Sequence, residues 1–424
     1  MIPDGIAAAR GLSPEARPLV PRPTTGEDRA ACRRSRERSA EPRMSGRAVR
    51  ILAVLAALLV VVTLGVRWRF GGGQRLEDRT TAPRLQPAHL EPVANLDHPP
   101  GNVAVSADGR VFFTFHPDGD PPVKVAELVN GRPVPYPNEA YQKPADGKPH
   151  FRTPLALRID AKNRLWVLDH AGYAMGQPRL IAFDPATGQP DHLHEFPPEV
   201  APLLSMVNDF QISPDATKVY IAEASPIRRR PALIVYDATT GKSRRVLDGH
   251  PSVQAQDFLL QAPGRDMVAY GLYALKIPVD SIALDVPGEW LYFGPLSGDR
   301  MYRIRTADLD DETVTPPDLA ARVEDYGPKT ISDGLTTDVA GNVYVSDPEH
   351  SAVLILTPER KLVTLVKDGR LRWPDGFSFG PDGWLYVTAS ALQDVLFVSG
   401  SHVRASAPFQ IFRFKPGPEG VPGR

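Results

Sequence analysis

The sequence contains almost no cysteine, and its charges nearly cancel. Cys32 is the single Cys among 424 residues, and it lies in an Arg-rich N-terminal stretch. One thiol excludes a disulfide framework, and the rest of the chain lacks a thiolate nucleophile or metal ligand. The formal net charge is −1, although residues 1–50 hold 11 Arg against 6 acidic residues. The remainder is therefore mildly acidic, and no nucleic-acid partner is expected.

Familiar catalytic motifs are also scarce. The chain has no HExxH, GxGxxG or Walker sequence, so zincin, dinucleotide-binding and P-loop chemistry have no support. In contrast, 45 Pro and 34 Gly are present. This abundance of turn-forming residues favours an all-β fold with many short strands over a helical one.

One apolar run stands near the N-terminus. Residues 51–66 form 16 consecutive residues without a charge, with Arg on both sides. A membrane-spanning helix needs ~17–25 residues, and no small-residue cleavage site follows. We therefore predict a signal anchor over residues 44–70, with a cleaved signal peptide as the open alternative. The membrane is the expected partner of residues 51–66, and the rest is expected to be extracytoplasmic, either periplasmic or secreted.

Six related segments follow. Each is an apolar alternating strand, a turn of Asp, Gly, Asn or Pro, and a second strand, which is the signal of a β-hairpin. Aligned on the turn, the second strands carry an aromatic residue at one shared position. Further strands follow several hairpins. The segments span residues 103–115, 157–169, 210–223, 282–294, 335–347 and 377–390, and the aromatic residues are Phe112, Trp166, Tyr220, Tyr292, Tyr344 and Tyr386.

Six units of up to four strands predict a six-bladed β-propeller over residues 91–415. We expect the strand around Pro92–Leu96 to complete the last blade as its outer strand and so to close the ring. The propeller is expected to be monomeric. The flanking segments are predicted as a disordered extension (1–43), a linker (71–90) and a disordered tail (416–424), because they are rich in Arg, Pro or Gly and lack periodicity.

The repeat separates two copies of Pro-Asp-Gly that lie close together in PDGFSFGPDGWLY, residues 374–386. Asp382 aligns with the hairpin turns, where any good turn former suffices. Asp375 aligns with the first residues of the innermost strands, which line the central channel of a propeller. Its equivalents include Asn208, Asp280 and Asp333. These four side chains are expected to form a ring at one mouth of the channel.

Oxygen ligands from several blades suit a hard divalent cation, most of all Ca²⁺. Asn208, Asp280, Asp333 and Asp375 are therefore predicted metal ligands, with Asp333 and Asp375 as catalytic candidates. The alternative is that these residues cap their own backbone. A ligand-binding surface on the same rim is predicted from the adjoining residue Asp209 and from the ends of the second strands; its members are Asn208, Asp209, Asp169, Glu223, Asp347 and His350.

Several segments resemble the major royal jelly/yellow protein family. The most specific are ALIVYDATTGKSRRVL (232–247) and LYFGPLS (291–297). The resemblance implies a six-bladed propeller, usually secreted, with a small-molecule pocket at one end of the channel, and an isomerase activity has been proposed for some members. A looser similarity connects VNDF (207–210) and SDGL (332–335) to the senescence marker protein/gluconolactonase propellers, which implies a divalent cation and a lactonase activity.

Two functions from different classes are therefore open. The first is a secreted or membrane-anchored propeller that binds a small molecule at the mouth of the channel. The second is a metal-dependent lactonase-type hydrolase, in which the cation polarises an ester carbonyl and Asp333 or Asp375 is the general base. A scaffold that displays loops to protein partners is a weaker third hypothesis, because propellers are widely reused.

Overall fold

The computed structural model describes residues 45–144 and 149–424. Its first element is helix α2 (Gly46–Phe70), of 25 residues, none of them buried. By length and composition alone, this helix is able to cross a membrane. It contains the predicted apolar run and extends it at both ends. The predicted disordered extension, residues 1–43, lies outside the described residues.

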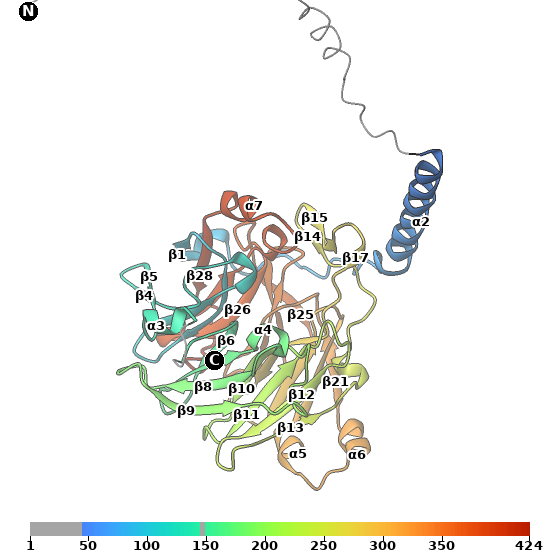
Figure 1. The fold of residues 1–424 in the computed structure, drawn as a ribbon. Coiled ribbons are helices and arrows are strands. Elements are labelled where there is room, and N and C mark those ends of the chain that lie inside the picture. The colour runs from blue at the N-terminus through green and yellow to red at the C-terminus, as the bar shows by residue number, and fades with distance from the viewer. Residues whose placement is uncertain (1–44, 145–148) are drawn as a thin grey trace, which may run out of the picture. The chain divides into compact units, whose positions relative to one another are not determined.

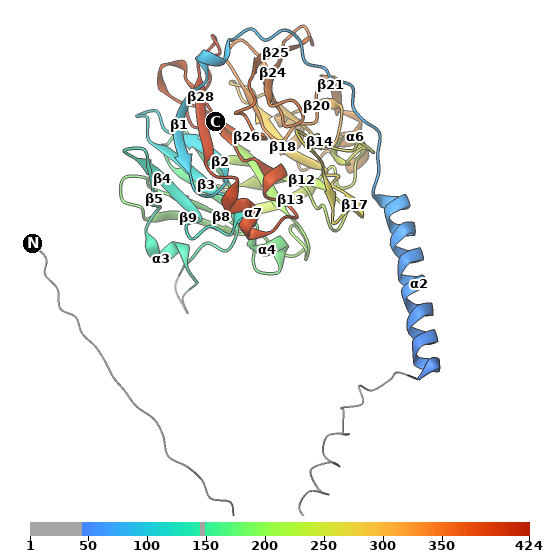
Figure 2. The same cartoon turned by 90° about the horizontal axis from the view of Figure 1, so that it is seen from above.

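The rest of the chain forms six antiparallel four-stranded sheets arranged as a ring, which confirms the predicted six-bladed β-propeller (Figures 1 and 2). In blades 1 to 5, chain order follows the order of strands within the sheet. The strands of blades 1 to 3 are β2 (Pro100–Val105), β3 (Val111–Phe115), β4 (Val125–Val129), β5 (Arg132–Pro135), β6 (Pro154–Ile159), β7 (Leu165–Asp169), β8 (Arg179–Phe183), β9 (Pro190–Glu195), β10 (Val207–Ile212), β11 (Lys218–Glu223), β12 (Ala232–Asp237) and β13 (Lys242–Val246).

The second half of the ring follows the same plan. The strands of blades 4 to 6 are β18 (Val279–Leu284), β19 (Trp290–Pro295), β20 (Arg300–Arg305), β21 (Glu324–Pro328), β22 (Leu335–Thr337), β23 (Val343–Asp347), β24 (Ala352–Leu356), β25 (Leu362–Lys367), β26 (Pro374–Phe379), β27 (Leu385–Ala389), β28 (Phe409–Phe414) and β1 (Glu91–Leu96). The connections carry α3 (Glu139–Gln142), α4 (Ala171–Ala174), α5 (Thr306–Asp310), α6 (Pro316–Ala321), α7 (Gly400–Ala405) and two small hairpins, β14 (Gln261–Ala262) with β15 (Arg265–Asp266) and β16 (Val268–Ala269) with β17 (Tyr273–Ala274).

The N-terminal strand closes the ring. β1 pairs with β28, so the sixth blade has the order β1-β28-β27-β26. Leu96 lies opposite Phe409 and Glu91 lies opposite Arg413, whose guanidinium is 2.9 Å from the Glu91 carboxylate. This confirms the predicted outer strand. Because the two ends of the propeller share one sheet, the ring cannot open without breaking a ladder of backbone hydrogen bonds.

The aromatic position of the repeat lies between blades. All six aromatic side chains are buried, from 0% exposed for Trp166 to 6% for Tyr386. Two of their polar tips bond an Asp beside the preceding hairpin turn: Trp166 Nε1 donates to Asp160 at 2.8 Å, and the Tyr344 hydroxyl donates to Asp338 at 2.9 Å. The aromatic residues thus fill the core between sheets while their polar atoms remain satisfied.

The C-terminal segment differs from the predicted disordered tail. Residues 416–424 cross the ends of the innermost strands that lie opposite the predicted mouth. Phe379 N donates to Arg424 O at 2.8 Å, Ile159 N donates to Gly423 O at 3.1 Å, and Val339 N donates to Glu419 O at 2.8 Å. Three blades are therefore connected by this segment. Its glycines permit the close approach, since a Cβ at Gly420 would lie 2.0 Å from the Phe379 ring.

The segment 71–90, predicted as a linker, follows the outer edge of blade 5. Thr81 N donates to Thr364 Oγ1 at 2.7 Å, and Thr364 N donates to Thr81 Oγ1 at 3.0 Å. Leu85 N continues the pairing to Leu365 O at 2.8 Å. These bonds cover part of β25, which would otherwise present unpaired backbone groups to solvent.

Candidate functional site

The innermost strands share an irregularity where the predicted site residues lie. In five blades, the pairing between the innermost strand and its neighbour shifts within the first few residues. Asn208, Asp280 and Asp375 lie inside these shifted intervals. A bulge releases a residue from the regular ladder and redirects its side chain. The five shifts fall at residues 100–103, 154–156, 207–210, 279–282 and 374–377.

Hydroxyl groups from the second strands satisfy the backbone released by these irregularities. Thr114 Oγ1 accepts from Asn102 N at 2.9 Å, and Thr388 Oγ1 accepts from Gly376 N at 2.9 Å. In blade 5, Ser346 Oγ accepts from Asp333 N at 3.0 Å. The backbone around the mouth is thus fixed by protein contacts.

Four carboxylates at this mouth form what we call the acidic cluster: Asp209, Asp280, Asp333 and Asp375. Burial, followed by the charges of Asp333 and Asp375, raises the pKa of Asp280 well above its ordinary value. Burial and then the charge of Asp333 do the same for the pKa of Asp375. Burial raises the pKa of Asp333 to about 6, against a lowering hydrogen bond from Trp373. Such mutual influence is what carboxylates produce when they lie close together in the folded state.

Each carboxylate except one has a strong partner. Arg158 Nη2 contacts both oxygens of Asp209, at 2.9 and 3.0 Å, and Arg158 is 1% exposed. Trp373 Nε1 donates to Asp333 Oδ2 at 2.5 Å. Ser390 Oγ donates to Asp375 Oδ2 at 2.8 Å. Asp280 is the exception.

Two oxygens of the predicted metal ligands lack a hydrogen-bond partner although they are buried. These atoms are Asn208 Oδ1 and Asp280 Oδ1. Asn208 is 9% exposed and Asp280 is 5% exposed. A buried acceptor without a donor costs about 1–3 kcal/mol, so such atoms require an explanation. A positively charged or hydrogen-bond-donating ligand would supply one.

Lys329 contributes positive charge next to this cluster. Its side chain is fully buried, and Nζ donates to Gly298 O at 2.8 Å and to Thr330 O at 3.0 Å. Burial lowers the pKa of Lys329 to about 7, and Asp280 is among the acidic groups that oppose this lowering. With Asp209, Asp280, Asp333 and Asp375 ionised, Arg158 and Lys329 together leave the mouth with an excess of negative charge.

The cluster fits a hard cation by its donor chemistry but is not gathered around one point. The four predicted ligands, Asn208, Asp280, Asp333 and Asp375, offer only oxygen atoms, as Ca²⁺ prefers. However, Asp333 and Asp375 are turned toward Trp373 and Ser390. Within residues 45–144 and 149–424, no group of three or more His, Cys, Asp or Glu side chains is placed to hold a metal ion.

The predicted ligand-binding residues at the ends of the second strands bind protein groups of the rim loops. The carboxylates of Asp169, Glu223 and Asp347 are fully buried. Asp169 accepts from Arg152 N at 2.8 Å and Thr153 N at 2.9 Å. Glu223 accepts from Ser205 Oγ at 2.7 Å and Met206 N at 3.1 Å.

Asp347 binds within its own loop, where it accepts from His350 N at 3.0 Å and lies 3.0 Å from His350 Nδ1. The hydrogen bond to Asp347 raises the pKa of His350. Asp169, Glu223 and Asp347 thus accept hydrogen bonds from protein donors and stabilise the loops of the rim. Of the predicted ligand-binding residues, only Asp209 belongs to the acidic cluster, next to Asn208 in β10.

Sequence reasoning missed Arg158, Trp373, Ser390 and Lys329. Arg158 had a detectable signal, because it is the one charged residue in the otherwise apolar strand β6. Trp373 and Ser390 flank the sixth blade's innermost hairpin, and neither belongs to a repeated position. Lys329 follows β21 and precedes the predicted site residue Asp333 by four positions. Its burial could not be read from the sequence, since lysine is ordinarily exposed.

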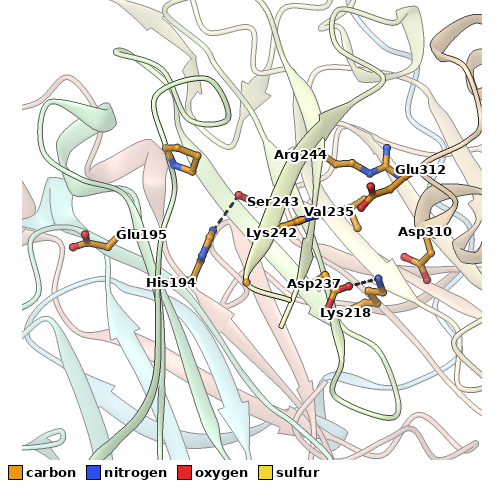
Figure 3. Close-up of a pocket in the computed structure, with 12 residues that line it drawn as sticks. His194, Glu195, Lys218, Val235, Asp237, Lys242, Ser243, Arg244, Asp310 and Glu312 are labelled. Carbon is orange, nitrogen blue, oxygen red and sulfur yellow. Dashed lines mark hydrogen bonds and ion pairs between the residues drawn. The ribbon is translucent and has the colours of Figure 1, made fainter. Parts of the chain in front are cut away.

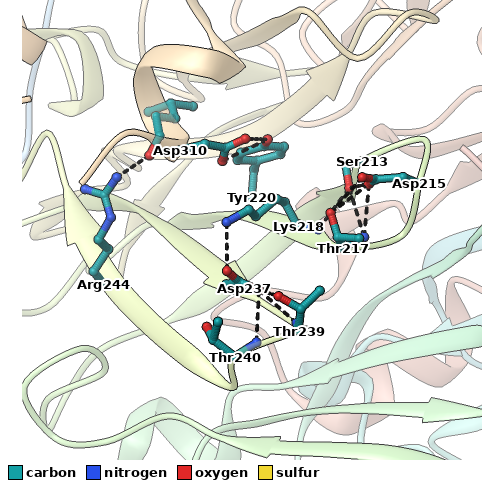
Figure 4. Close-up of polar contacts among 11 residues, drawn as sticks. Ser213, Asp215, Thr217, Lys218, Tyr220, Asp237, Thr239, Thr240, Arg244 and Asp310 are labelled. Atoms are coloured by element: carbon teal, nitrogen blue, oxygen red, sulfur yellow. Dashed lines mark hydrogen bonds and ion pairs between the residues drawn. The ribbon is translucent and has the colours of Figure 1, made fainter. Parts of the chain in front are cut away.

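A hollow of about 550 Å³ lies at the outer edge of blade 3 (Figure 3), and none of the residues that line it belongs to the acidic cluster. Several of its polar groups are paired: Lys218 Nζ is 2.9 Å from Asp237 Oδ2, and the Tyr220 hydroxyl donates to Asp310 at 3.0 Å (Figure 4). His194 Nε2 is 3.0 Å from Ser243 Oγ. The channel mouth is the stronger candidate site, because Asn208 Oδ1 and Asp280 Oδ1 there are buried and unpartnered.

Known structures share this fold at low sequence identity. A luciferin-regenerating enzyme is 12% identical with a TM-score of 0.50, covering 79% of this chain and 97% of its own. A protein assigned as a gluconolactonase is 13% identical with a TM-score of 0.51, covering 82% and 99%. A calcium-binding regucalcin from Agrobacterium tumefaciens is 13% identical with a TM-score of 0.49, covering 77% and 95%. At these identities, the similarity to the luciferin-regenerating enzyme and to the protein assigned as a gluconolactonase shows the fold alone.

The sequence itself gives a more specific assignment. No curated protein sequence matches the chain. The family model of the major royal jelly proteins, however, matches residues 153–395. This match covers more than half of the chain, including blades 2 to 5, the innermost hairpin of blade 6 and the acidic cluster. The chain therefore belongs to the major royal jelly protein family.

Proposed function

We propose that this protein binds a small, positively charged molecule at the channel mouth formed by Asn208, Asp280, Asp333 and Asp375. The observation that carries the proposal is the pair of buried, unpartnered oxygens, Asn208 Oδ1 and Asp280 Oδ1. They belong to neighbouring blades and adjoin carboxylates whose pKa values are raised. A protonated amine would donate hydrogen bonds to both oxygens and offset the excess negative charge.

The location of the protein belongs to the same proposal. Helix α2 is long and apolar enough to cross a membrane, and its flanking Arg residues are typical of the ends of such helices. The propeller is then an extracytoplasmic domain held at the membrane by α2. Binding of a small molecule at one mouth agrees with what the family membership implies.

A second candidate function is a lactonase that depends on a divalent cation. The all-oxygen donor set and the excess negative charge support it, together with a fold shared with a protein assigned as a gluconolactonase. Asn208, Asp280, Asp333 and Asp375 would hold the cation, which would supply Lewis-acid activation of an ester carbonyl. Asp333, with a pKa of about 6, is suited to accept a proton near neutral pH.

Calorimetric titration of the full chain in detergent separates the two functions. The titrants are CaCl₂ and a panel of primary amines as chloride salts, with NaCl as the control. Binding of an amine without added metal supports the first function. Calcium binding together with hydrolysis of aldonolactones supports the second. If neither titrant binds the wild type, or if binding survives Asp280→Asn unchanged, the mouth is not the site.

A further inference from the structure

Exposed apolar side chains are concentrated on one face of the propeller. Beyond helix α2, ten large hydrophobic side chains are exposed within the described residues. Four of these, Val129, Val134, Leu193 and Val339, are on outer strands or on the opposite face. The remaining six constitute what we call the mouth-face patch: Met175, Leu203, Ile227, Tyr270, Tyr273 and Phe397.

The topology places all six on the rim of the acidic cluster. The second strand of each blade runs back toward the start of the innermost strand. Loops between second and third strands, and loops between consecutive blades, therefore lie on the same face. Met175, Ile227 and Phe397 are in loops of the first kind. Leu203, Tyr270 and Tyr273 are in loops of the second kind. In Figure 1, α7 and β14, β15 and β17 lie together at this end, whereas α5 and α6 lie at the other.

Much of the patch is contiguous. The rings of Tyr270 and Phe397 are 5.9 Å apart, and those of Tyr273 and Phe70 are 6.1 Å apart. Phe70, Tyr273 and Arg229 line one hollow. Arg229 belongs to the same loop as Ile227. All these residues belong to the compact unit 63–424. Aromatic side chains at such density on a surface are typical of interfaces with membranes or proteins.

Charge and chain connectivity point to lipid as the partner. Arg229 and Arg230 are exposed beside the patch, and Arg230 also contacts Asp248 at 3.2 Å. Gln74 N donates to Asp257 O at 2.7 Å, which attaches the chain to this face four residues after the end of α2. Four residues reach at most about 14 Å. If α2 spans a bilayer, the patch cannot lie far from its surface.

We propose that the mouth-face patch docks into the interfacial region of the bilayer that α2 spans. Its aromatic and aliphatic side chains enter the boundary between headgroups and acyl chains, and Arg229 and Arg230 face anionic headgroups. The channel mouth then opens toward the membrane surface. This inference does not depend on the identity of the ligand, and its test contains no ligand.

The test compares two residues that are equally exposed on opposite faces. Leu203 and Val339 are each 63% exposed. In a Cys32→Ser background, which removes the single native thiol, Leu203→Cys and Val339→Cys are labelled with a small fluorophore. The full chain is reconstituted into liposomes of phosphatidylcholine and phosphatidylglycerol. Quenching is measured with aqueous iodide and, separately, with nitroxide-labelled lipid.

Docking predicts that the label at position 203 is shielded from iodide and quenched by nitroxide lipid, whereas the label at position 339 shows the reverse. Equal iodide quenching at both positions would overturn the proposal. Shielding at position 203 without quenching by nitroxide lipid would also overturn it, because a protein partner or a second copy of the chain would then cover the patch. Tyr270→Cys, at a site 82% exposed, provides a second label that must behave like the one at position 203.

Discussion

Arg158 and Asp209 form a two-point ion pair inside the channel, with Arg158 Nη2 at 2.9 and 3.0 Å from the carboxylate oxygens. The pair joins blades 2 and 3, and its Asp209 carboxylate is a member of the acidic cluster. Arg158 is 1% exposed and Asp209 is 7% exposed. Because Arg158 already neutralises Asp209, any excess negative charge at the mouth comes from Asp280, Asp333 and Asp375 when these groups ionise.

Arg158→Met should destabilise the protein strongly. It leaves Asp209 as an uncompensated buried charge, which typically costs about 3–5 kcal/mol. Chemical denaturation of the single variant and of the double variant Arg158→Met/Asp209→Asn measures this cost. The double variant should recover much of the lost stability, because no unpaired ion remains. Equal stability of the single variant and the wild type would show that the pair does not form.

Asp333→Asn should make the unliganded protein more stable at neutral pH. The pKa of Asp333 is raised from 3.8 to about 6 in the folded protein, so the folded state binds a proton more tightly than the unfolded chain. The Asp333 carboxyl group therefore makes its full contribution to the free energy of unfolding below about pH 4. That contribution is lost as the pH rises through 6. Asparagine cannot ionise, and its oxygen still accepts from Trp373.

At pH 7 and above, Asp333→Asn should raise the free energy of unfolding by up to ~3 kcal/mol, since each pKa unit corresponds to about 1.4 kcal/mol. It should vanish near pH 4. Thermal unfolding between pH 4 and 8 measures it, with Asp382→Asn on the opposite rim as the control. A variant that is less stable than the wild type at pH 7 without ligand would contradict the electrostatic account.

Asp169→Ala should lower the free energy of unfolding without abolishing ligand binding at the channel mouth. The Asp169 carboxylate accepts from Arg152 N, Thr153 N and Ala171 N, and its removal leaves buried donors unsatisfied, at about 1–3 kcal/mol each. A lower unfolding midpoint is expected, with ligand affinity of the folded fraction unchanged. Loss of affinity in a variant that remains folded would instead return Asp169 to the ligand-binding site.

Gly420→Ala should release the C-terminal segment from the propeller. The new methyl group would lie 2.0 Å from Phe379 Cδ2, and such overpacking typically costs about 1–3 kcal/mol. Hydrogen exchange of residues 416–424 should rise. Gly369→Ala is the matched control, since nothing lies within 4 Å of its position. Unchanged exchange in Gly420→Ala would show that the segment is not held in this way.

The repeat made most of the fold predictable. The six hairpins, their aromatic position and the closing strand β1 were visible because each blade repeats the same requirement for burial at the same spacing. The C-terminal segment was not predictable from composition. Pro and Gly are frequent in disordered tails, but Gly420 and Gly423 are also what allows a backbone to lie directly against Phe379 and Ile159.

The site was predictable only where it follows the repeat. Asn208, Asp280, Asp333 and Asp375 share one aligned position, and the structure brings them to one mouth. Their hydrogen-bond partners do not repeat. Trp373 reaches Asp333 from a different blade, and Lys329 is buried against carbonyl oxygens of another loop. Such contacts depend on loop conformations that a single sequence does not specify.

The two Pro-Asp-Gly sequences of blade 6 allow the most direct test of the acidic cluster. Asp375→Asn and Asp382→Asn make the same chemical change in the same blade, at the mouth and at the opposite turn. Asp382 has a φ of 59°, which asparagine tolerates well. The measurement is the affinity of the full chain for the tightest cationic titrant, amine or Ca²⁺. Our account predicts a large loss of affinity for Asp375→Asn and none for Asp382→Asn; equal affinity in both variants would contradict it.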